Sequence, residues 1–163
     1  MPEVYSPVGA DLSLQTSTPL FKLGTRARCS DDQQYLYVRF SGAITQYWTV
    51  AIDEDFVARP CTTTLAGQAN APGFAQMAFT TQYYGWAAVH GANLFAFCRD
   101  NVATNSQLYA TPSAGKLTAT ASTGNPLLIN GVRSATAAVS GGGATEIIAT
   151  YPSFSNTTKP AGT

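Results

Sequence analysis

Charge is scarce in this 163-residue chain, because only 11% of its residues are Asp, Glu, Lys or Arg, where a soluble domain ordinarily carries about 25%. The nine basic and nine acidic residues balance, and they are scattered along the sequence. Without a basic stripe to neutralise phosphates, nucleic acid is not an expected partner. Since net charge keeps proteins apart in solution, so uncharged a surface favours a chain that other subunits partly cover.

Long apolar runs, paired cysteines and a basic N-terminus are also missing. No segment approaches the roughly 20 apolar residues of a membrane span, and residues 1–15 lack the basic and apolar regions of a signal peptide. Cys29, Cys61 and Cys98 are odd in number and far apart, which argues for free thiols made in a reducing compartment and against a disulfide framework or a zinc site. We therefore expect no membrane partner, no metal and no other cofactor.

What the chain has instead is alternation of apolar and polar residues, the pattern of half-buried strands. In residues 35–40, YLYVRF, the even positions form the core face, so Tyr35 and Tyr37 are expected to face solvent. Further strands are expected at residues 47–52, 56–59, 73–79, 84–90, 93–98, 107–110, 116–120, 127–133 and 145–151. Many short strands separated by turn residues predict an all-β fold, a small antiparallel β-barrel or sandwich.

The N-terminal residues differ from the rest of the chain, because they carry three prolines and dispersed apolar side chains without a period. Proline favours extended backbone, and a solvated tail would be poorer in apolar residues. The sequence thus predicts an extended N-terminal arm at residues 1–22, a β-barrel domain at 23–154 and a C-terminal tail at 155–163. The candidate anchors of the arm at an interface are its large apolar groups, Tyr5, Leu12, Leu14 and Phe21.

Residues 80–98, TTQYYGWAAVHGANLFAFC, contain one of the two tryptophans, the only histidine and one of the three cysteines. The alternation predicts a hairpin, with strands at 84–90 and 93–98 around a turn at Gly91 and Ala92. A catalytic nucleophile needs a base within hydrogen-bond reach and an orienting group behind it. Because His90 and Cys98 come without a nucleophile motif or a third member, we interpret this segment as structural and expect no enzymatic activity.

Two other features admit a functional interpretation. Residues 53–55, Asp-Glu-Asp, offer the oxygens that calcium prefers, but the spacing of a calcium loop is missing, so we interpret them as a solvated hairpin turn. Tyr35, Tyr37 and Tyr47, as solvent-facing aromatics, mark either a protein interface, since such rings bury much area at low entropy cost, or a platform on which a sugar stacks. The residues alone leave these two alternatives open.

Short motifs occur along the chain in an informative order. They are FKLGT (21–25), YLYV (35–38), SGAI (41–44), GFAQ (73–76), YGW (84–86), QLY (107–109), AGKL (114–117) and INGV (129–132). This series resembles the head decoration (capsid cement) proteins of tailed bacteriophages, over residues 21 to about 133. One departure follows the SGAI turn, where residues 46–48 are Gln-Tyr-Trp and the family usually has Gly and Asp.

The resemblance implies a small β-barrel, commonly a homotrimer, that binds the outer face of a phage head and stabilises contacts between major capsid protein subunits. It implies no catalytic residue and no cofactor. The expected location is the outer surface of the virion capsid, after assembly in the host bacterial cytoplasm. The alternative is a receptor- or carbohydrate-binding virion module, such as a fibre or tail domain, which an uncharged surface with exposed aromatics would also suit.

Overall fold

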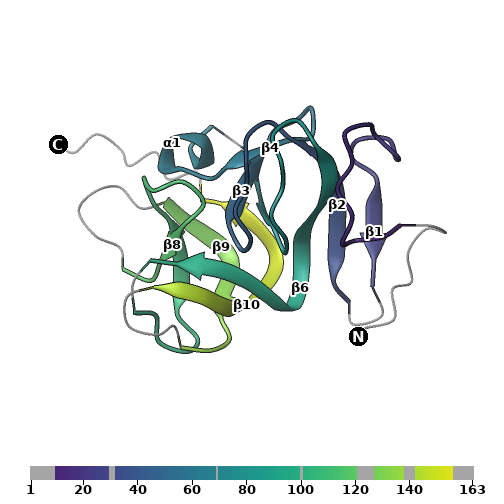
Figure 1. The fold of residues 1–163 in the computed structure, drawn as a ribbon. Coiled ribbons are helices and arrows are strands. Elements are labelled where there is room, and N and C mark those ends of the chain that lie inside the picture. The colour runs from purple at the N-terminus through teal and green to yellow at the C-terminus, as the bar shows by residue number, and fades with distance from the viewer. Residues whose placement is uncertain are drawn as a thin grey trace.

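A computed structural model describes residues 10–29, 32–68, 70–99, 101–120, 127–137 and 142–155. The described strands are β1 (Arg26–Arg28), β2 (Gln34–Phe40), β3 (Thr49–Ile52), β4 (Val57–Pro60), β5 (Ala71–Phe74), β6 (Tyr84–Cys98), β7 (Gln107–Ala110), β8 (Leu117–Thr118), β9 (Leu127–Ser134) and β10 (Gly143–Phe154). A short helix, α1 (Thr63–Ala66), follows β4 (Figure 1). With 50% of residues in strands and 3% in helix, the all-β prediction is confirmed.

The strands form a sheet that closes on itself. Their hydrogen-bonded order is β1-β2-β4-β3-β5-β6-β10-β9-β7-β8, and β2 also pairs with β6, which closes β2, β4, β3, β5 and β6 into a five-stranded barrel. A further pairing of β6 with β8 links β6, β10, β9, β7 and β8 into a second ring. The long β6 belongs to both rings (Figure 1). Among the described pairs, β2–β4 and β6–β8 are parallel and the others antiparallel.

The interior of the five-stranded barrel is filled by one cluster of buried side chains. Its members are Leu36, Val38, Phe40, Ile44, Val50, Ile52, Ala58, Ala75, Phe79 and Ala87. The rings of Phe40 and Phe79 stack there with their centroids 3.7 Å apart. The even positions of residues 35–40 therefore face the barrel interior, as the alternation predicts.

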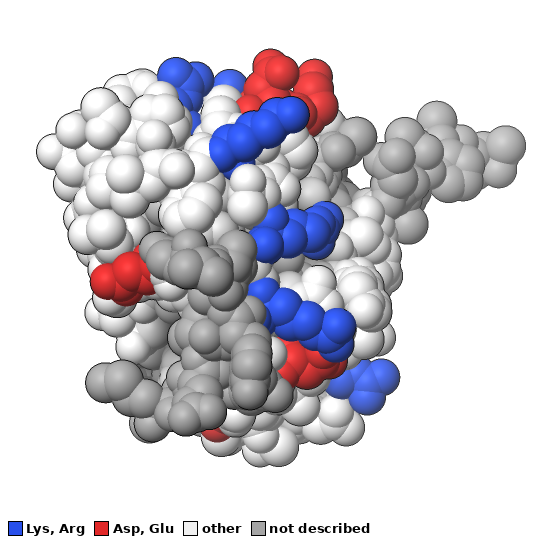
Figure 2. Space-filling view, turned by 90° about the vertical axis from the view of Figure 1, so that its right-hand side faces the viewer, with Lys and Arg blue, Asp and Glu red and all other residues white. Residues whose placement is uncertain are grey.

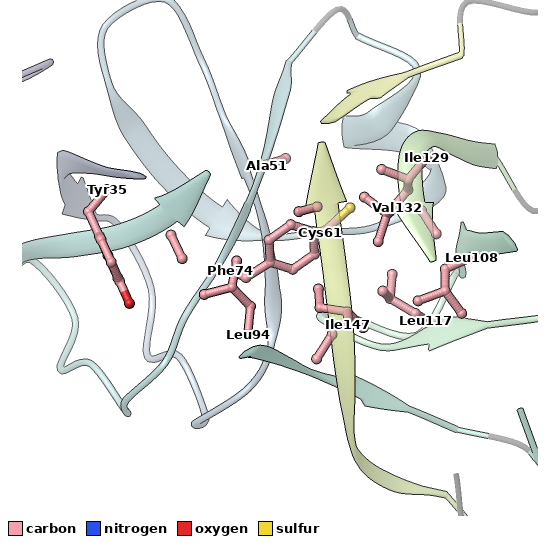
Figure 3. Packing of buried hydrophobic residues seen from close by; sticks show 14 of the residues in the cluster. Tyr35, Ala51, Cys61, Phe74, Leu94, Leu108, Leu117, Ile129, Val132 and Ile147 are labelled. Atoms are coloured by element: carbon pink, nitrogen blue, oxygen red, sulfur yellow. The ribbon is translucent and has the colours of Figure 1, made fainter. Parts of the chain in front are cut away.

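A second, larger cluster extends from the outer face of β2 and β6 into the second ring. Figure 3 shows Leu108, Leu117 and Val132 gathered beside Ile147 of β10. Tyr35 and Tyr37 belong to the same cluster and are 8% and 2% exposed, so the prediction that they face solvent is wrong.

The outer face of β2 is covered by residues from two distant parts of the chain. The ring of Phe21 lies 5.4 Å from that of Tyr37, and the ring of Trp86 lies 5.0 Å from it. The Tyr35 hydroxyl donates to Oε1 of Gln33. Alternation marks which side chains share a face, but it does not tell whether another segment covers that face. A tyrosine can be buried in this way because its only polar side-chain group is the hydroxyl at the tip of the ring, which one hydrogen-bond partner satisfies.

Residues 84–98 are one continuous strand, β6, so the predicted hairpin with a turn at Gly91 and Ala92 is wrong. Gly91 (φ 127°) and Asn93 (φ 56°) have left-handed backbone, which bends the strand without reversing it. Before the bend β6 pairs with β2, and after it β6 pairs with β10. A bend and a tight turn have similar local sequences, and only the strands that pair on either side of the segment distinguish the two.

Candidate functional site

The histidine lies where β6 meets β10 and the β1–β2 connection. His90 is 8% exposed. Its Nδ1 accepts a hydrogen bond from the backbone N–H of Tyr151 at 3.2 Å, and its Nε2 lies 3.4 Å from Oδ2 of Asp32. The imidazole also packs on the ring of Tyr151, with centroids 4.3 Å apart. Both ring nitrogens therefore face a partner within the protein.

The carboxylate beside the imidazole is shared with a second cation. Asp32 accepts hydrogen bonds from the guanidinium of Arg28 on β1, and both side chains are largely exposed. The hydrogen bond from Arg28 and then that from His90 lower the pKa of Asp32 below its ordinary value of 3.8. Asp32 is thus held ionised next to the histidine.

An aspartate that orients a histidine is one half of a catalytic triad, in which the other imidazole nitrogen activates a nucleophile. Here the backbone N–H of Tyr151 occupies that nitrogen, and a backbone N–H cannot act as a nucleophile. Cys98 is fully buried in the second ring. It lies on the same strand as His90 but beyond the bend at Gly91, and because a strand advances about 3.3 Å per residue, the two side chains are not neighbours. The arrangement around His90 fits a structural contact between strands.

The buried thiols fit a structural role as well. Cys29, Cys61 and Cys98 are buried, and none of them is in a disulfide bond. Burial raises the pKa of the Cys61 thiol to about 12, so that thiol stays protonated near neutral pH and is a poor nucleophile, because the thiolate is the reactive form.

The acidic residues 53–55 form the predicted turn. Oδ1 of Asp53 accepts hydrogen bonds from the backbone N–H groups of Asp55 and Val57, at 3.1 and 2.9 Å, and Oδ2 lies 3.5 Å from Nη2 of Arg59. This carboxylate closes the β3–β4 connection on itself. Within the described part of the chain, no three His, Cys, Asp or Glu residues are grouped so that they could hold a metal ion.

The N-terminal residues that the structure describes lie along the barrel. Thr16 and Tyr84 exchange backbone hydrogen bonds of 3.0 and 2.8 Å, and the backbone N–H of Leu20 donates to the Tyr37 hydroxyl at 3.1 Å. Leu12 and Phe21 are partly buried and pack on the larger cluster. Residues 10–22 contain turns and bends with a single isolated bridge at Thr16, and they are attached to the barrel of their own chain.

The predicted anchors of the arm therefore fall into different classes. Leu12 and Phe21 contact the barrel, whereas Leu14 is 45% exposed. Leu20, which sequence reasoning did not single out, is 57% exposed. Tyr5 lies outside the described residues, as does the predicted tail after Ser155. Among the large apolar side chains of the described arm, Leu14 and Leu20 are the ones exposed to a neighbour.

Tyr47 lies in a surface group that alternation did not reveal. Its ring is half-buried and lies 5.3 Å from that of Phe95, which is 37% exposed, with 43° between the ring planes. The side-chain amide of Gln76 accepts from the backbone N–H of Phe95 and donates to its carbonyl, both at 3.0 Å. Ile148 and Tyr151 of β10 are also exposed, 45% and 73%. The alternation in residues 93–98 could have placed Phe95 on an outer face.

The fold gathers basic residues that the sequence disperses. Arg26 and Arg28 of β1, Arg39 of β2 and Arg59 of β4 lie on neighbouring strands. Figure 2 shows Lys and Arg side chains following one another down the face that carries β1, with acidic groups beside them, on an otherwise largely uncharged surface. Arg28 and Arg59 each have an aspartate partner. Two of the four arginines are therefore paired with an acidic side chain on the same face.

A shallow groove of about 410 Å³ lies on the outer side of β9 and β10, lined by Asn105, Gly131, Arg133, Ile148 and Thr150. The guanidinium Nη1 of Arg133 lies 3.4 Å from Oδ1 of Asn105. The groove combines one cation with one exposed apolar side chain, and it contains no acid or base that could transfer a proton near neutral pH.

No protein-family model matches the chain, and no curated protein matches it significantly. In the part of the chain that the structure describes, no helix has the length and apolar character needed to cross a membrane. The strands and their surface are thus the observations on which a function has to rest.

Proposed function

We propose that this protein is a capsid decoration protein that binds the outer face of a phage head and stabilises contacts between major capsid protein subunits. The observation that supports the proposal concerns three glycines of the motifs that carry the resemblance. At each of them the backbone packs so closely against an aromatic ring that a larger side chain would not fit. A Cβ on Gly24, Gly85 or Gly115 would lie 2.6, 2.4 or 2.5 Å from the ring of Phe56, Phe79 or Trp48, respectively. Residues of this kind specify an architecture rather than a reaction.

The surface supports the same proposal. Among the residues that the structure describes, the exposed large apolar side chains lie on two areas, the arm (Leu14, Leu20) and the strands β6 and β10 (Phe95, Ile148, Tyr151). Exposed apolar groups on a surface with few charges are typical of a protein whose neighbours cover part of it. Two separate areas would let each copy contact more than one shell subunit, so that many weak contacts together oppose shell opening.

Quantification of the virion that encodes this chain tests the proposal directly. We expect a copy number comparable to that of the major capsid protein, because a decoration protein repeats with the shell lattice, and density on the outer face of the head. Mass spectrometry of purified particles and cryo-electron microscopy provide the two measurements. Absence from the particle, or a few copies confined to the tail, would contradict the proposal.

The isolated protein is expected to form a compact homotrimer. The physical reason is the low charge of its surface together with the two exposed apolar areas. Analytical ultracentrifugation at micromolar concentration measures the mass, with circular dichroism as a check that the sample has the β-rich spectrum of the fold. A strictly monomeric profile from a folded sample would rule out the trimer.

The carbohydrate-binding alternative rests on the aromatic pair of Tyr47 and Phe95. A stacking platform needs an open ring face and free polar groups around it. Tyr47 is only half-exposed and tilted by 43° to Phe95, and both amide atoms of Gln76 already bond the backbone of Phe95. This geometry favours the decoration function. Binding of the purified protein on a glycan array would reverse that preference.

A further inference from the structure

The strand β10 departs from regular pairing around Tyr151. Its register with β9 shifts between Ala149↔Val132 and Ser153↔Asn130, so residues 150–152 bulge out of the ladder. Tyr151 has a φ of 44°, a conformation that is costly for a non-glycine residue and persists only where surrounding contacts hold it. Its side chain is 73% exposed, so packing of the ring alone does not explain why the bulge is kept.

A hydrogen bond between the backbone of Tyr151 and the ring of His90 holds the bulge. The backbone N–H of Tyr151 donates to Nδ1 of His90 at 3.2 Å. Because a backbone N–H can only donate, Nδ1 must be unprotonated in this arrangement. The neutral imidazole then carries its proton on Nε2, which lies 3.4 Å from Oδ2 of Asp32. The hydrogen bonds thereby specify both the tautomer and the charge of the ring.

A second proton on the ring would break this arrangement. It would bind Nδ1 and place two N–H donors against each other, which leaves the amide of Tyr151 without an acceptor. The other ionisable groups around the ring are Asp32 and Arg28 from the β1–β2 region and the Tyr151 phenol from β10.

Of the two charged neighbours, only Asp32 favours a charged imidazole. Its side chain is 59% exposed and already paired with Arg28, and attraction between exposed charges is weak. The guanidinium of Arg28, on the same carboxylate, repels the imidazolium. Protonation of His90 would therefore exchange the hydrogen bond from Tyr151 for an attraction to a carboxylate that Arg28 already neutralises.

We propose that His90 is a pH-sensitive latch that holds the Tyr151 bulge of β10 while neutral and releases it when protonated. Histidine is the side chain that ordinarily changes its charge between about pH 5 and 8. The pKa of Asp32 lies below its ordinary value of 3.8 because of the hydrogen bonds from Arg28 and His90, so that carboxylate stays charged across the same range. The latch acts on the strand that carries the exposed Ile148 and Tyr151, and it does not depend on the proposed function.

Nuclear magnetic resonance on the full chain tests the latch at pH 7.5 and 5.0. At pH 7.5 the nitrogen shifts of His90 should show an unprotonated Nδ1. At pH 5.0 the protection of the Tyr151 amide against hydrogen exchange, corrected for the intrinsic rate, should fall about tenfold, as expected for the loss of one hydrogen bond. A protonated Nδ1 at pH 7.5, or equal protection at both pH values, would overturn the proposal.

Two substitutions separate the latch from general acid destabilisation. His90→Asn offers an amide oxygen near the position of Nδ1 and does not titrate, so protection of the Tyr151 amide should no longer depend on pH. Asp32→Asn removes the charge that favours the imidazolium, so release should move to lower pH. If His90→Asn loses protection as the wild-type protein does, or if Asp32→Asn moves release to higher pH, His90 is not the latch.

Discussion

Replacing Gly85 by alanine should reduce the free energy of unfolding by about 3 kcal/mol, the upper range for overpacking a core. A Cβ at this position would lie 2.4 Å from Cε1 of Phe79, and that ring cannot easily move away because it stacks on Phe40 at 3.7 Å inside the closed barrel. Denaturant titration at a fixed protein concentration measures the change, since assembly would make the apparent stability depend on concentration.

The matched control is Gly42→Ala. A Cβ there meets only Cδ of Pro60, at 3.8 Å, so the free energy of unfolding should change by no more than about 0.5 kcal/mol. The size of the effect at Gly85 would then reflect the close approach of Phe79 and not the general exchange of glycine for alanine.

A second variant identifies the atom responsible. Phe79→Leu removes the ring edge, so the double variant with Gly85→Ala should lose less stability than the sum of the two single variants, by at least about 1 kcal/mol. Strict additivity would mean that the two residues are not in contact. Gly85 belongs to the YGW motif on which the resemblance partly rests, so this cycle also tests whether the motif is needed for the barrel.

The sequence predicts strands well where one face is apolar and turn residues flank the segment. Residues 107–110 form β7 as expected, and the even positions of residues 35–40 fill the barrel. Prediction from the sequence fails where the burial or the pairing of a strand depends on segments that are distant in the chain. Tyr37 is buried because Phe21 and Trp86 pack against its ring, and periodicity within one strand holds no information about such contacts.

The bend at Gly91 and the helix α1 both escape prediction from the sequence, for related reasons. A glycine after a run of alternation fits a turn or a bend equally well, and only the change of partner from β2 to β10 makes β6 continuous. The helix α1 has four residues, too few for a helical period to be seen in the sequence. Its N-cap, Thr62, accepts from the backbone N–H of Leu65, a signal that is weak without a periodic segment after it.

The surroundings of His90 could not be predicted from sequence spacing. Asp32 and Tyr151 lie 58 and 61 positions away from it, and they meet because β6 pairs with β2 on one side of the bend and with β10 on the other. Clusters of this kind depend on topology and therefore appear only in the folded chain.

Substituting the two exposed leucines of the arm should separate binding from folding. The double variant Leu14→Ser/Leu20→Ser should reduce capsid occupancy about tenfold or more, equivalent to about 1.4 kcal/mol, because these side chains are 45% and 57% exposed and available to a neighbour. Its melting temperature should stay within about 2 °C of the wild-type value, as expected for surface positions. Occupancy is measured on undecorated heads over a range of protein concentrations.

The matched control is Phe21→Ala, in the same segment. Its ring packs 5.4 Å from Tyr37 and 5.3 Å from Trp86, so its loss should reduce the free energy of unfolding by about 2 kcal/mol. Removing the whole arm would mix the two effects, because Thr16 exchanges backbone hydrogen bonds with Tyr84 of the barrel. If the Leu14→Ser/Leu20→Ser variant occupies heads as tightly as the wild-type protein, the exposed side of the arm does not bind the shell, and the capsid contacts must lie on β6 and β10.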